Sequence, residues 1–317
     1  MAKEPFEEMR ARMIKKAKEG ITSAYSNEEH ALMQAINAYL ETNKSYNLVF
    51  ERLSEWYGIY FPEIKMSNPK ALADLAIVLN SREGISKESI TSIIEDTQKA
   101  DSIYNKAKVT IGREMSKKER EAVLHFARLS NQMYDTLLGL EAYIKATSTE
   151  IMPNTTYLTD EKIAAELLSK AGSLARLASM PASTVQLLGA EKALFKHIKF
   201  GSNPPKYGVL FKLAEISNGP RDKRGRIARV YAAKICIALK ADYFTKNFIA
   251  EKLKSDIENV VQKIKESPAR ERSGKTPNQF SKPFHGRTQR GQGGSNKPNR
   301  FSGQKNRSDR SPKWHKR

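Results

Sequence analysis

Apolar residues recur every three or four positions along most of the chain, which is the period of amphipathic α-helices. The pattern predicts a short charged helix over residues 5–24 and a long helix over residues 28–61, which ends at Pro62 because proline cannot continue a helix. A short helix is predicted over residues 68–80. Residues 207–211 are the one candidate strand before Pro268. The predicted fold class is therefore all-α.

Residues 86–144 carry two apolar seams in which positions three and four apart alternate, as in coiled coils. The first runs from Ile90 to Ile111 and the second from Val123 to Ile144, with a turn predicted over residues 112–116. The two seams predict an antiparallel helical hairpin. Because each seam contains weak members such as Thr97 and Ser130, an isolated hairpin would be poorly stable. A second copy would complete a four-helix bundle, so we expect a homodimer.

Four helical runs follow the hairpin, and the chain divides into four parts. Helices are predicted over residues 161–180, 183–199, 221–244 and 247–265. The last has an inward face formed by Ile249, Leu253, Ile257, Val260 and Ile264. The parts are an N-terminal charged helix (1–27), a coiled-coil and dimerisation domain (28–158), a second helical domain (159–267) and a basic tail (268–317).

Net charge narrows the class of partner. The chain carries a formal charge of +20, and its last fifty residues contain fourteen Lys or Arg residues against Glu271 and Asp309. Such a tail cannot bury enough apolar surface to offset its chain entropy, so we expect it to be disordered. Its segment 287–294 resembles Arg/Gly-rich tails that add sequence-tolerant affinity for RNA. The basic body and tail indicate an anionic partner, most simply nucleic acid.

The sequence offers no secretory or membrane-spanning pattern and no catalytic constellation. No apolar run approaches the roughly 20 residues that span a bilayer, and no apolar region follows Lys3. Cys236 is the single cysteine, and the five histidines lack metal-ligand spacing. The segment 219–225 lacks the Gly-Lys-Ser/Thr ending of a phosphate-binding loop. We therefore expect an intracellular protein with no membrane contact and no cofactor, which is not itself an enzyme.

Basic residues gather on one face of the helix predicted over residues 221–244. On a helical wheel, Lys223, Arg226, Arg229, Lys234 and Lys240 share one arc, with Val230 and Ile237 among them. A second arc is apolar and consists of Ile227, Tyr231, Ile235, Ala238 and Leu239. One face is thus expected to be buried while the other grips phosphates. The alternative is the solvated face of a basic helix.

Several segments together resemble one family. They are 184–195 (Thr-Val-Gln-Leu-Leu-Gly-Ala-Glu-Lys-Ala-Leu-Phe), 204–208 (Pro-Pro-Lys-Tyr-Gly), 224–229, 232–235 and 241–244. This ordered set resembles the Nop domain and, more narrowly, the archaeal Nop subunit of box C/D guide-RNA particles. The resemblance covers roughly residues 12–265 and identifies 159–267 as the Nop domain. It implies a non-catalytic, RNA-binding scaffold of a ribonucleoprotein that directs 2′-O-methylation of RNA, including ribosomal RNA.

The resemblance also implies which partners and residues are used. The family recognises a kink-turn RNA that already carries a small ribosomal-type protein, and its Gly-Ala-Glu-Lys helix abuts the guide–substrate duplex. Lys196 stands where the family has Arg, which keeps the charge but loses the planar fork. The residues expected to contact RNA are Gly189, Ala190, Glu191, Lys192, Lys196, His197, Lys199, Lys206, Arg221, Lys223, Arg224, Arg226 and Arg229.

Some of these residues have a second interpretation. The small size of Gly189 and Ala190 suits close helix packing as well as close approach to RNA. Glu191 is adjacent to Lys192 and does not face it on a helix, so we expect it to meet another basic residue or a helix N-terminus. His197 is expected to pack or to contact RNA. Lys206 is the candidate least easily explained by fold stability.

The chain departs from the family at its N-terminus. Members usually begin with an α/β domain that docks the methyltransferase fibrillarin, and that domain is expected to be absent here. Three explanations are open for this difference: the chain is natively short, the domain is encoded separately, or the sequence is truncated. Fibrillarin binding therefore rests on kinship alone.

Other functions and two locations remain open. The nearest rival is a splicing-factor-type Nop protein with no methylation role, and another is a coiled-coil protein whose tail binds nucleic acid nonspecifically. The expected location is the cytoplasm of an archaeal-type cell, or the nucleus and nucleolus of a eukaryote.

Overall fold

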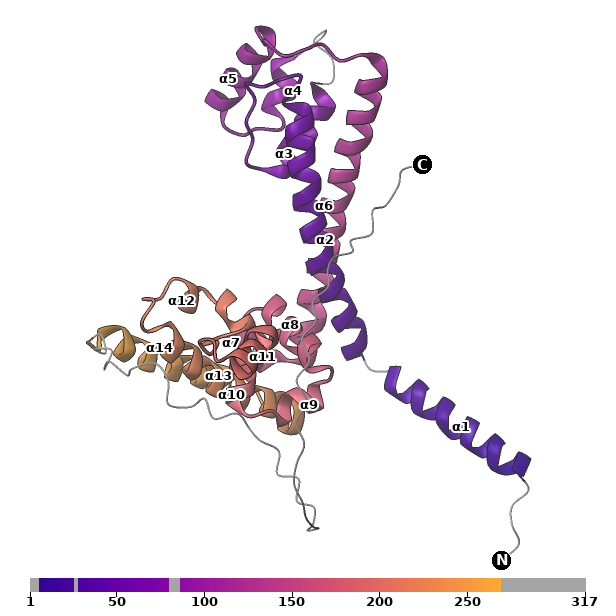
Figure 1. Ribbon diagram of the computed structural model, residues 1–317, viewed down its shortest axis with the longest axis vertical. Helices are drawn as coiled ribbons and strands as arrows, with labels where there is room; N and C mark the ends of the chain where they lie inside the picture. Colours follow the sequence, from indigo (N-terminus) through magenta and orange to yellow (C-terminus); the bar gives the residue numbers. More distant parts are fainter. Residues whose placement is uncertain (1–5, 26–27, 80–85, 269–317) are drawn as a thin grey trace, which may run out of the picture. The chain divides into compact units, whose positions relative to one another are not determined.

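The computed structural model describes residues 6–25, 28–79 and 86–268, and all regular elements within these ranges are helical (Figure 1). The all-α prediction is confirmed, and the candidate strand at 207–211 is wrong because a 3₁₀-helix forms there. The basic tail predicted to be disordered, residues 268–317, lies outside the described residues except for Pro268. The elements are α1 (Phe6–Tyr25), α2 (Glu28–Tyr57), α3 (Pro69–Val78), α4 (Lys87–Thr91), α5 (Thr97–Lys108), α6 (Lys117–Ile151), α7 (Pro153–Leu158), α8 (Glu161–Ala171), α9 (Leu174–Ser179), α10 (Ala182–Leu187), α11 (Glu191–Phe200), the 3₁₀-helix η1 (Val209–Lys212), α12 (Ala214–Ser217), α13 (Arg224–Lys240), the π-helix η2 (Ala241–Thr245) and α14 (Ala250–Glu266).

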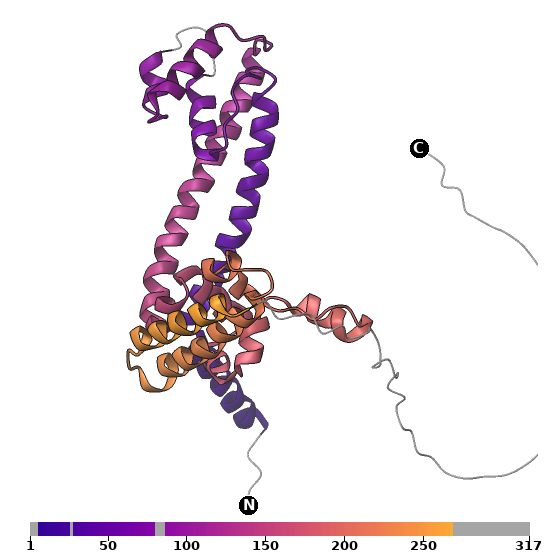
Figure 2. The same ribbon diagram turned by 90° about the vertical axis from the view of Figure 1, so that its left-hand side faces the viewer.

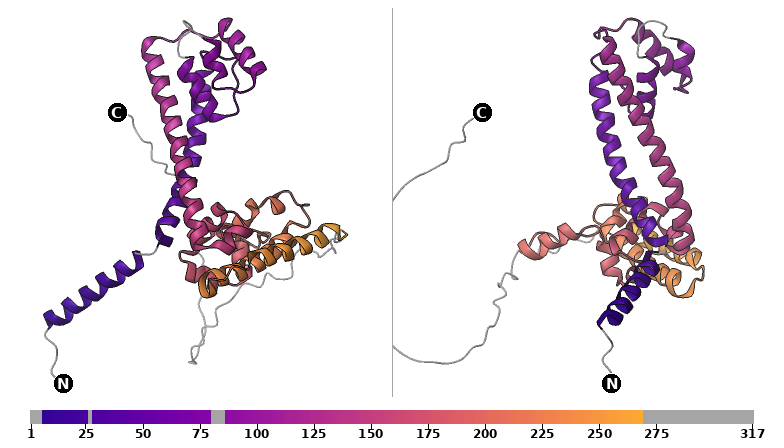
Figure 3. Two further views of the ribbon diagram at one scale, coloured as in Figure 1. Left: turned by 180° about the vertical axis from the view of Figure 1, so that it is seen from behind. Right: turned by 90° about the vertical axis from the view of Figure 1, so that its right-hand side faces the viewer.

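The long helices α2 and α6 pack side by side in opposite directions (Figures 1 and 3). Leu32, Ile36 and Leu53 of α2 are buried, as are Val123 and Ile144 of α6. A capping box starts α6, in which the Ser116 hydroxyl accepts from the Glu119 N–H and the Glu119 carboxylate accepts from the Ser116 N–H at 2.9 Å. Among the described residues, no helix is both long and apolar enough to cross a membrane.

The predicted pairing of residues 86–111 with residues 116–144 is wrong. The partner of α6 is α2, and α3 also packs on it. The first predicted seam breaks after α4, because the Asp96 carboxylate accepts from the N–H groups of Gln98 and Lys99 at 3.0 and 3.2 Å and starts a new helix, α5. Ile111, the last member of that seam, is 89% exposed. The second predicted seam is a buried face of α6, but it packs against α2 and α3.

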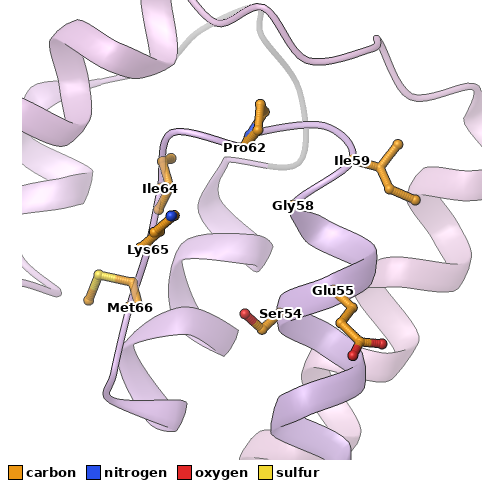
Figure 4. A pocket seen from close by; sticks show the side chains of 8 residues that line it. All are labelled: Ser54, Glu55, Gly58, Ile59, Pro62, Ile64, Lys65 and Met66. Carbon is orange, nitrogen blue, oxygen red and sulfur yellow. The ribbon is translucent and has the colours of Figure 1, made fainter.

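A second hydrophobic core lies where α2 ends and α6 begins. The helix α2 ends at Tyr57, four residues before the predicted end, because the chain turns at Gly58 and brings Tyr60 and Phe61 back into the interior. The turn leaves an open hollow of about 490 Å³ (Figure 4), which is lined by Ser54, Glu55, Gly58, Ile59, Pro62, Ile64, Lys65 and Met66.

Apart from α11, the helices after residue 152 share one core with the N-terminal half of α2 and the C-terminal half of α6. The predicted helix over 161–180 is broken at Gly172, whose φ of +87° ends α8, and Ser173 then caps α9. The apolar arc of α13 is buried as predicted. On α14, Val261 is buried rather than the predicted Val260, and Ile249 is exposed because it precedes the helix.

A buried carboxylate joins the two ends of this core. Asp242, in the π-helix η2, is fully buried. Its two oxygens accept from the Asn154 N–H and side-chain amide at 2.9 and 2.8 Å, and from the Thr155 N–H and hydroxyl at 3.0 and 2.7 Å. The Asn154 amide also donates to the Asn247 carbonyl at 2.9 Å, and its oxygen accepts from the Ile249 N–H at 2.6 Å. We call these contacts the Asp242 junction; they tie α7 to the end of α13 and the start of α14.

We predict that Asp242→Ala lowers the free energy of unfolding by at least about 3 kcal/mol, because it leaves four buried donors without an acceptor. Asp242→Asn keeps one acceptor oxygen and costs less. Guanidinium unfolding followed by circular dichroism measures both, with the exposed Asp135→Ala on α6 as control. A change below about 0.5 kcal/mol in Asp242→Ala would show that the junction is not a stabilising contact.

Candidate nucleic-acid interface

A glycine places α11 at an angle to α10. Gly189 has a φ of +86°, and a Cβ there would lie 2.6 Å from Val209 Cγ2. The Glu191 carboxylate accepts from the Gly189 N–H at 2.6 Å, so its hydrogen-bond partner lies just before its own helix, α11. Gly189 therefore serves close packing and a left-handed turn, and the sequence run 183–199 forms two helices instead of one.

The helix α11 has no buried residue (Figure 2, the salmon helix that stands apart). Lys192, Lys196 and Lys199 are spaced four and three apart and share one face, and Phe195 and Phe200 lie at its two edges, each 70% exposed. A row of ammonium groups between two aromatic rings suits a nucleic acid, which offers both phosphates and base faces. On another side of this helix, the Nδ1 atom of the half-buried His197 faces the Ser202 carbonyl.

Lys206 lies beside the start of α13. Its carbonyl accepts from the Gln186 side-chain amide at 2.6 Å, which fixes the loop. Gly208 packs so closely that a Cβ would fall 1.8 Å from the Leu188 carbonyl oxygen. A Cβ on Gly225 would lie 3.4 Å from Lys206 Cδ, so the lysine stem runs over the first turn of α13. The exposed ammonium group is thus carried on a rigid support.

Three predicted RNA contacts are engaged within the chain. The Lys223 ammonium group donates to the carbonyls of Lys265 and Ser267 at 2.8 and 2.6 Å, and caps the end of α14. Arg226 donates to the Ser267 hydroxyl at 3.0 Å. Arg224 donates to the Gly219 carbonyl at 2.9 Å, and its guanidinium lies 5.6 Å from the centre of the Phe211 ring. Sequence reasoning missed Phe211 and Ser267, because their contacts come from segments distant in sequence.

Other cations have no ion-pair partner within the described part of the chain. Lys234 on the predicted basic arc is not one of them, since it pairs with Asp256 at 2.7 Å. The exposed side chains without such a partner among the predicted contacts are Lys192, Lys196, Lys199, Lys206, Arg221 and Arg229. They form two groups, one on α11 and one around the start of α13. We call them the unpaired cations.

The unpaired cations are groups that bind anions. Across the described ranges, no cluster of three or more His, Cys, Asp or Glu side chains could hold a metal ion. The hollow in Figure 4 has one acid and one base, Glu55 and Lys65, among otherwise apolar or small side chains. The unpaired cations therefore make the best candidate site, an interface for an anionic polymer.

A family model described as Nop, snoRNA binding domain, fibrillarin matches residues 38–263. The chain belongs to the Nop family. The matched segment contains the Asp242 junction and all the unpaired cations.

Several Nop relatives match the chain over most of its length. It is 35% identical over 250 residues to an uncharacterized NOP5 family protein of Methanocaldococcus jannaschii, covering 78% of this chain and 60% of the relative. It is 34% identical to nucleolar protein 56 of Dictyostelium discoideum, covering 76% and 47%, and 31% identical to that of Saccharomyces cerevisiae, covering 80% and 54%. The chain thus spans about half the length of the relatives it matches.

A solved fibrillarin/Nop5p complex aligns with 82% of this chain and 78% of the solved chain. Its identity is 24% and its TM-score is 0.43, a likeness too weak to carry an argument.

The contacts divide the cations of the Nop motif into two classes with different phenotypes. We predict that Lys223→Ala lowers the free energy of unfolding by about 1–2 kcal/mol, because the last carbonyls of α14 lose a charged donor. Lys192→Ala, which removes an unpaired cation, should leave it unchanged. Guanidinium unfolding of the two variants tests this, and equal stability would mean that the Lys223 cap contributes nothing.

Proposed function

We propose that this chain is a non-catalytic, RNA-binding scaffold of a box C/D-type guide ribonucleoprotein that positions 2′-O-methylation. Membership of the Nop family supports it, since the family model is described as a snoRNA-binding domain and several relatives are named nucleolar protein 56. The observation that carries the proposal is the set of unpaired cations. Unpaired surface cations add little to the stability of the fold, whereas a phosphate backbone binds them.

The ligand we infer is a kink-turn RNA that already carries a small ribosomal-type protein. The two groups of cations suit a composite target, because α11 stands clear of the other helices while Lys206 and Arg229 lie on the packed domain. Fibrillarin is a further proposed partner, on the ground that the matching family model names it. In a eukaryote the proposed location is the nucleolus, and in an archaeal cell the cytoplasm.

Self-association is proposed through α6. Five exposed residues of this helix are spaced three and four apart alternately, a second coiled-coil seam that no other described segment covers. We call it the outer seam; it consists of Leu129, Gln132, Thr136, Gly139 and Tyr143. A second copy of the chain would cover it and produce a homodimer.

For RNA binding, we predict that the double variant Lys206→Ala/Arg229→Ala weakens binding of the full chain to a kink-turn RNA that carries the small kink-turn protein. The slope of log K against log salt should fall by about 1 for each removed cation, because fewer counterions are released. Fluorescence anisotropy at several salt concentrations measures both quantities.

The matched control is Lys44→Ala/Lys118→Ala, which removes the same charge from exposed positions on α2 and α6. If both double variants lose affinity equally, binding depends only on net charge and the Nop surface has no special role. Binding that needs no kink-turn protein and no kink would likewise count against composite recognition. A kink-turn complex from a splicing particle, bound as tightly as a box C/D complex, would favour the splicing-type function.

For the dimer, we predict that Gly139→Glu shifts the full chain from dimer to monomer, because it places charge in the middle of the outer seam. A Cβ at Gly139 meets nothing within 4 Å, so the substitution disturbs no contact within the chain. Sedimentation equilibrium measures the change. Gly20→Glu on α1, where a Cβ also meets nothing within 4 Å, is the control. A wild-type chain that is monomeric at micromolar concentration would refute the proposal.

A further inference from the structure

Four aromatic side chains are exposed where α13 ends. Tyr157, Tyr243, Phe244 and Phe248 are between 39 and 66% exposed. Tyr157 and Phe248 meet edge to face with ring centres 5.6 Å apart, and Tyr243 and Phe244 do so at 4.8 Å. Aromatic rings usually contribute to stability by being buried, so four exposed rings around one helix end indicate an interaction surface. We call these four rings the aromatic platform.

The Asp242 junction holds the backbone beneath these rings. Asp242 directly precedes Tyr243, and its partners Asn154 and Thr155 precede Tyr157. The Asn154 amide binds the backbone on both sides of Phe248, at the Asn247 carbonyl and the Ile249 N–H. The rings are therefore exposed on a fixed frame and not on a loose loop. A preorganised surface of this kind binds without first paying the entropy of ordering itself.

Two lysines lie on or beside the platform. All seven residues from Tyr243 to Ile249 are exposed, and they include Lys246 but no acid. Lys246 has a φ of +57°, and within the described ranges no other residue except glycine lies in the left-handed region. The Lys254 ammonium lies 5.0 Å from the centre of the Tyr157 ring. Asp242, directly before this run, is buried with both oxygens hydrogen-bonded, and Glu251 follows the run in the first turn of α14.

Aromatic faces interleaved with lysines match single-stranded RNA better than a protein surface. Each base offers a π-face to a ring and each phosphate a charge to an ammonium group. The cores of protein interfaces are also rich in aromatic residues but are depleted in lysine. The exposed run Tyr243–Ile249 combines both features within seven residues, which favours RNA as the occupant.

We propose that the aromatic platform stacks unpaired bases of an RNA strand, and that it is a second RNA contact distinct from the unpaired cations. It lies at the C-terminal end of α13, whereas Lys206 lies at the N-terminal end. The 17 residues of α13 separate the two ends by about 25 Å. The inference rests on the proposed function only in that the chain binds RNA; it does not depend on which RNA.

The test uses the full chain and two RNAs, a blunt kink-turn RNA and the same RNA with a single-stranded extension of about eight nucleotides, a length within one such binding site. Phe244→Leu and Phe248→Leu keep an apolar side chain but remove the π-face. Each should lower the affinity for the extended RNA about fivefold to tenfold and leave the affinity for the blunt RNA unchanged. Ile59→Ala, at an exposed apolar position near the far end of α2, is the control.

The variant Lys206→Ala/Arg229→Ala separates this inference from the proposed function, because it should lower the affinity for both RNAs by the same factor. If it does so while the phenylalanine variants bind both RNAs like the wild type, the platform is refuted and the proposed function stands. If the phenylalanine variants bind the extended RNA more weakly while the double variant binds both RNAs like the wild type, the platform is supported and the proposed role of Lys206 and Arg229 is refuted. A change in oligomeric state without a change in RNA affinity would make the platform a protein interface and overturn the proposal. Circular dichroism melting of each variant verifies that it is folded.

Discussion

The arrangement of both proposed RNA-binding surfaces depends on one buried carboxylate, Asp242. Among the described residues no cation pairs with Asp242, so hydrogen bonds stabilise it, two of them from N–H groups in the first turn of α7, where a helix has amides that no carbonyl of its own satisfies. The same carboxylate ends α13 in a π-helix turn and, through Asn154, sets the start of α14. Since α13 runs through the core between this junction and the Lys206 loop, the junction fixes the axis along which the cations and the aromatic rings are placed.

At the other end of α13, the packing depends on glycines that bring backbones close together. Gly208 lies so close to the Leu188 carbonyl that a Cβ would not fit, and the Lys206 stem runs over Gly225 at ordinary van der Waals distance. Gly189 then turns the chain so that α11 leaves the core with all of its side chains unburied. An exposed amphipathic helix is costly for a fold that gains its stability from burial. Its position after the Gly189 turn supports the proposed binding role, in which the exposed Phe195 and Phe200 flank the lysines and the Lys199 ammonium lies 5.4 Å from the centre of the Phe200 ring.

The sequence predicted which face of a helix is buried better than it predicted which other helix that face packs against. The apolar arc of α13 and the seam of α6 follow from the 3.6-residue period, a local property of the chain. The partner of α6 does not follow from it, because α2 and residues 86–111 show the same period and only tertiary packing chooses between them. Asp96 was a local signal for the break in residues 86–111, since an Asp before Thr97 is a helix start. Gly172 and Gly189 were similar signals, and each interrupts a helix that was predicted to be continuous.

The candidate site was predicted by composition and resemblance, and the structure adds a distinction that neither contains. Lys223, Arg224 and Arg226 look like phosphate contacts in the sequence, but carbonyls and a hydroxyl from distant segments already occupy them. These cations keep free N–H donors, but they cannot reorient toward a phosphate without loosening their contacts, whereas no such contact holds the Lys206 and Arg229 side chains within the described residues. The binding free energy should therefore come chiefly from the unpaired cations, with the engaged cations keeping α13, α14 and the 219–220 turn in register beneath them. Charge counting alone treats all of these residues as equivalent, and their hydrogen-bond partners show that they are not.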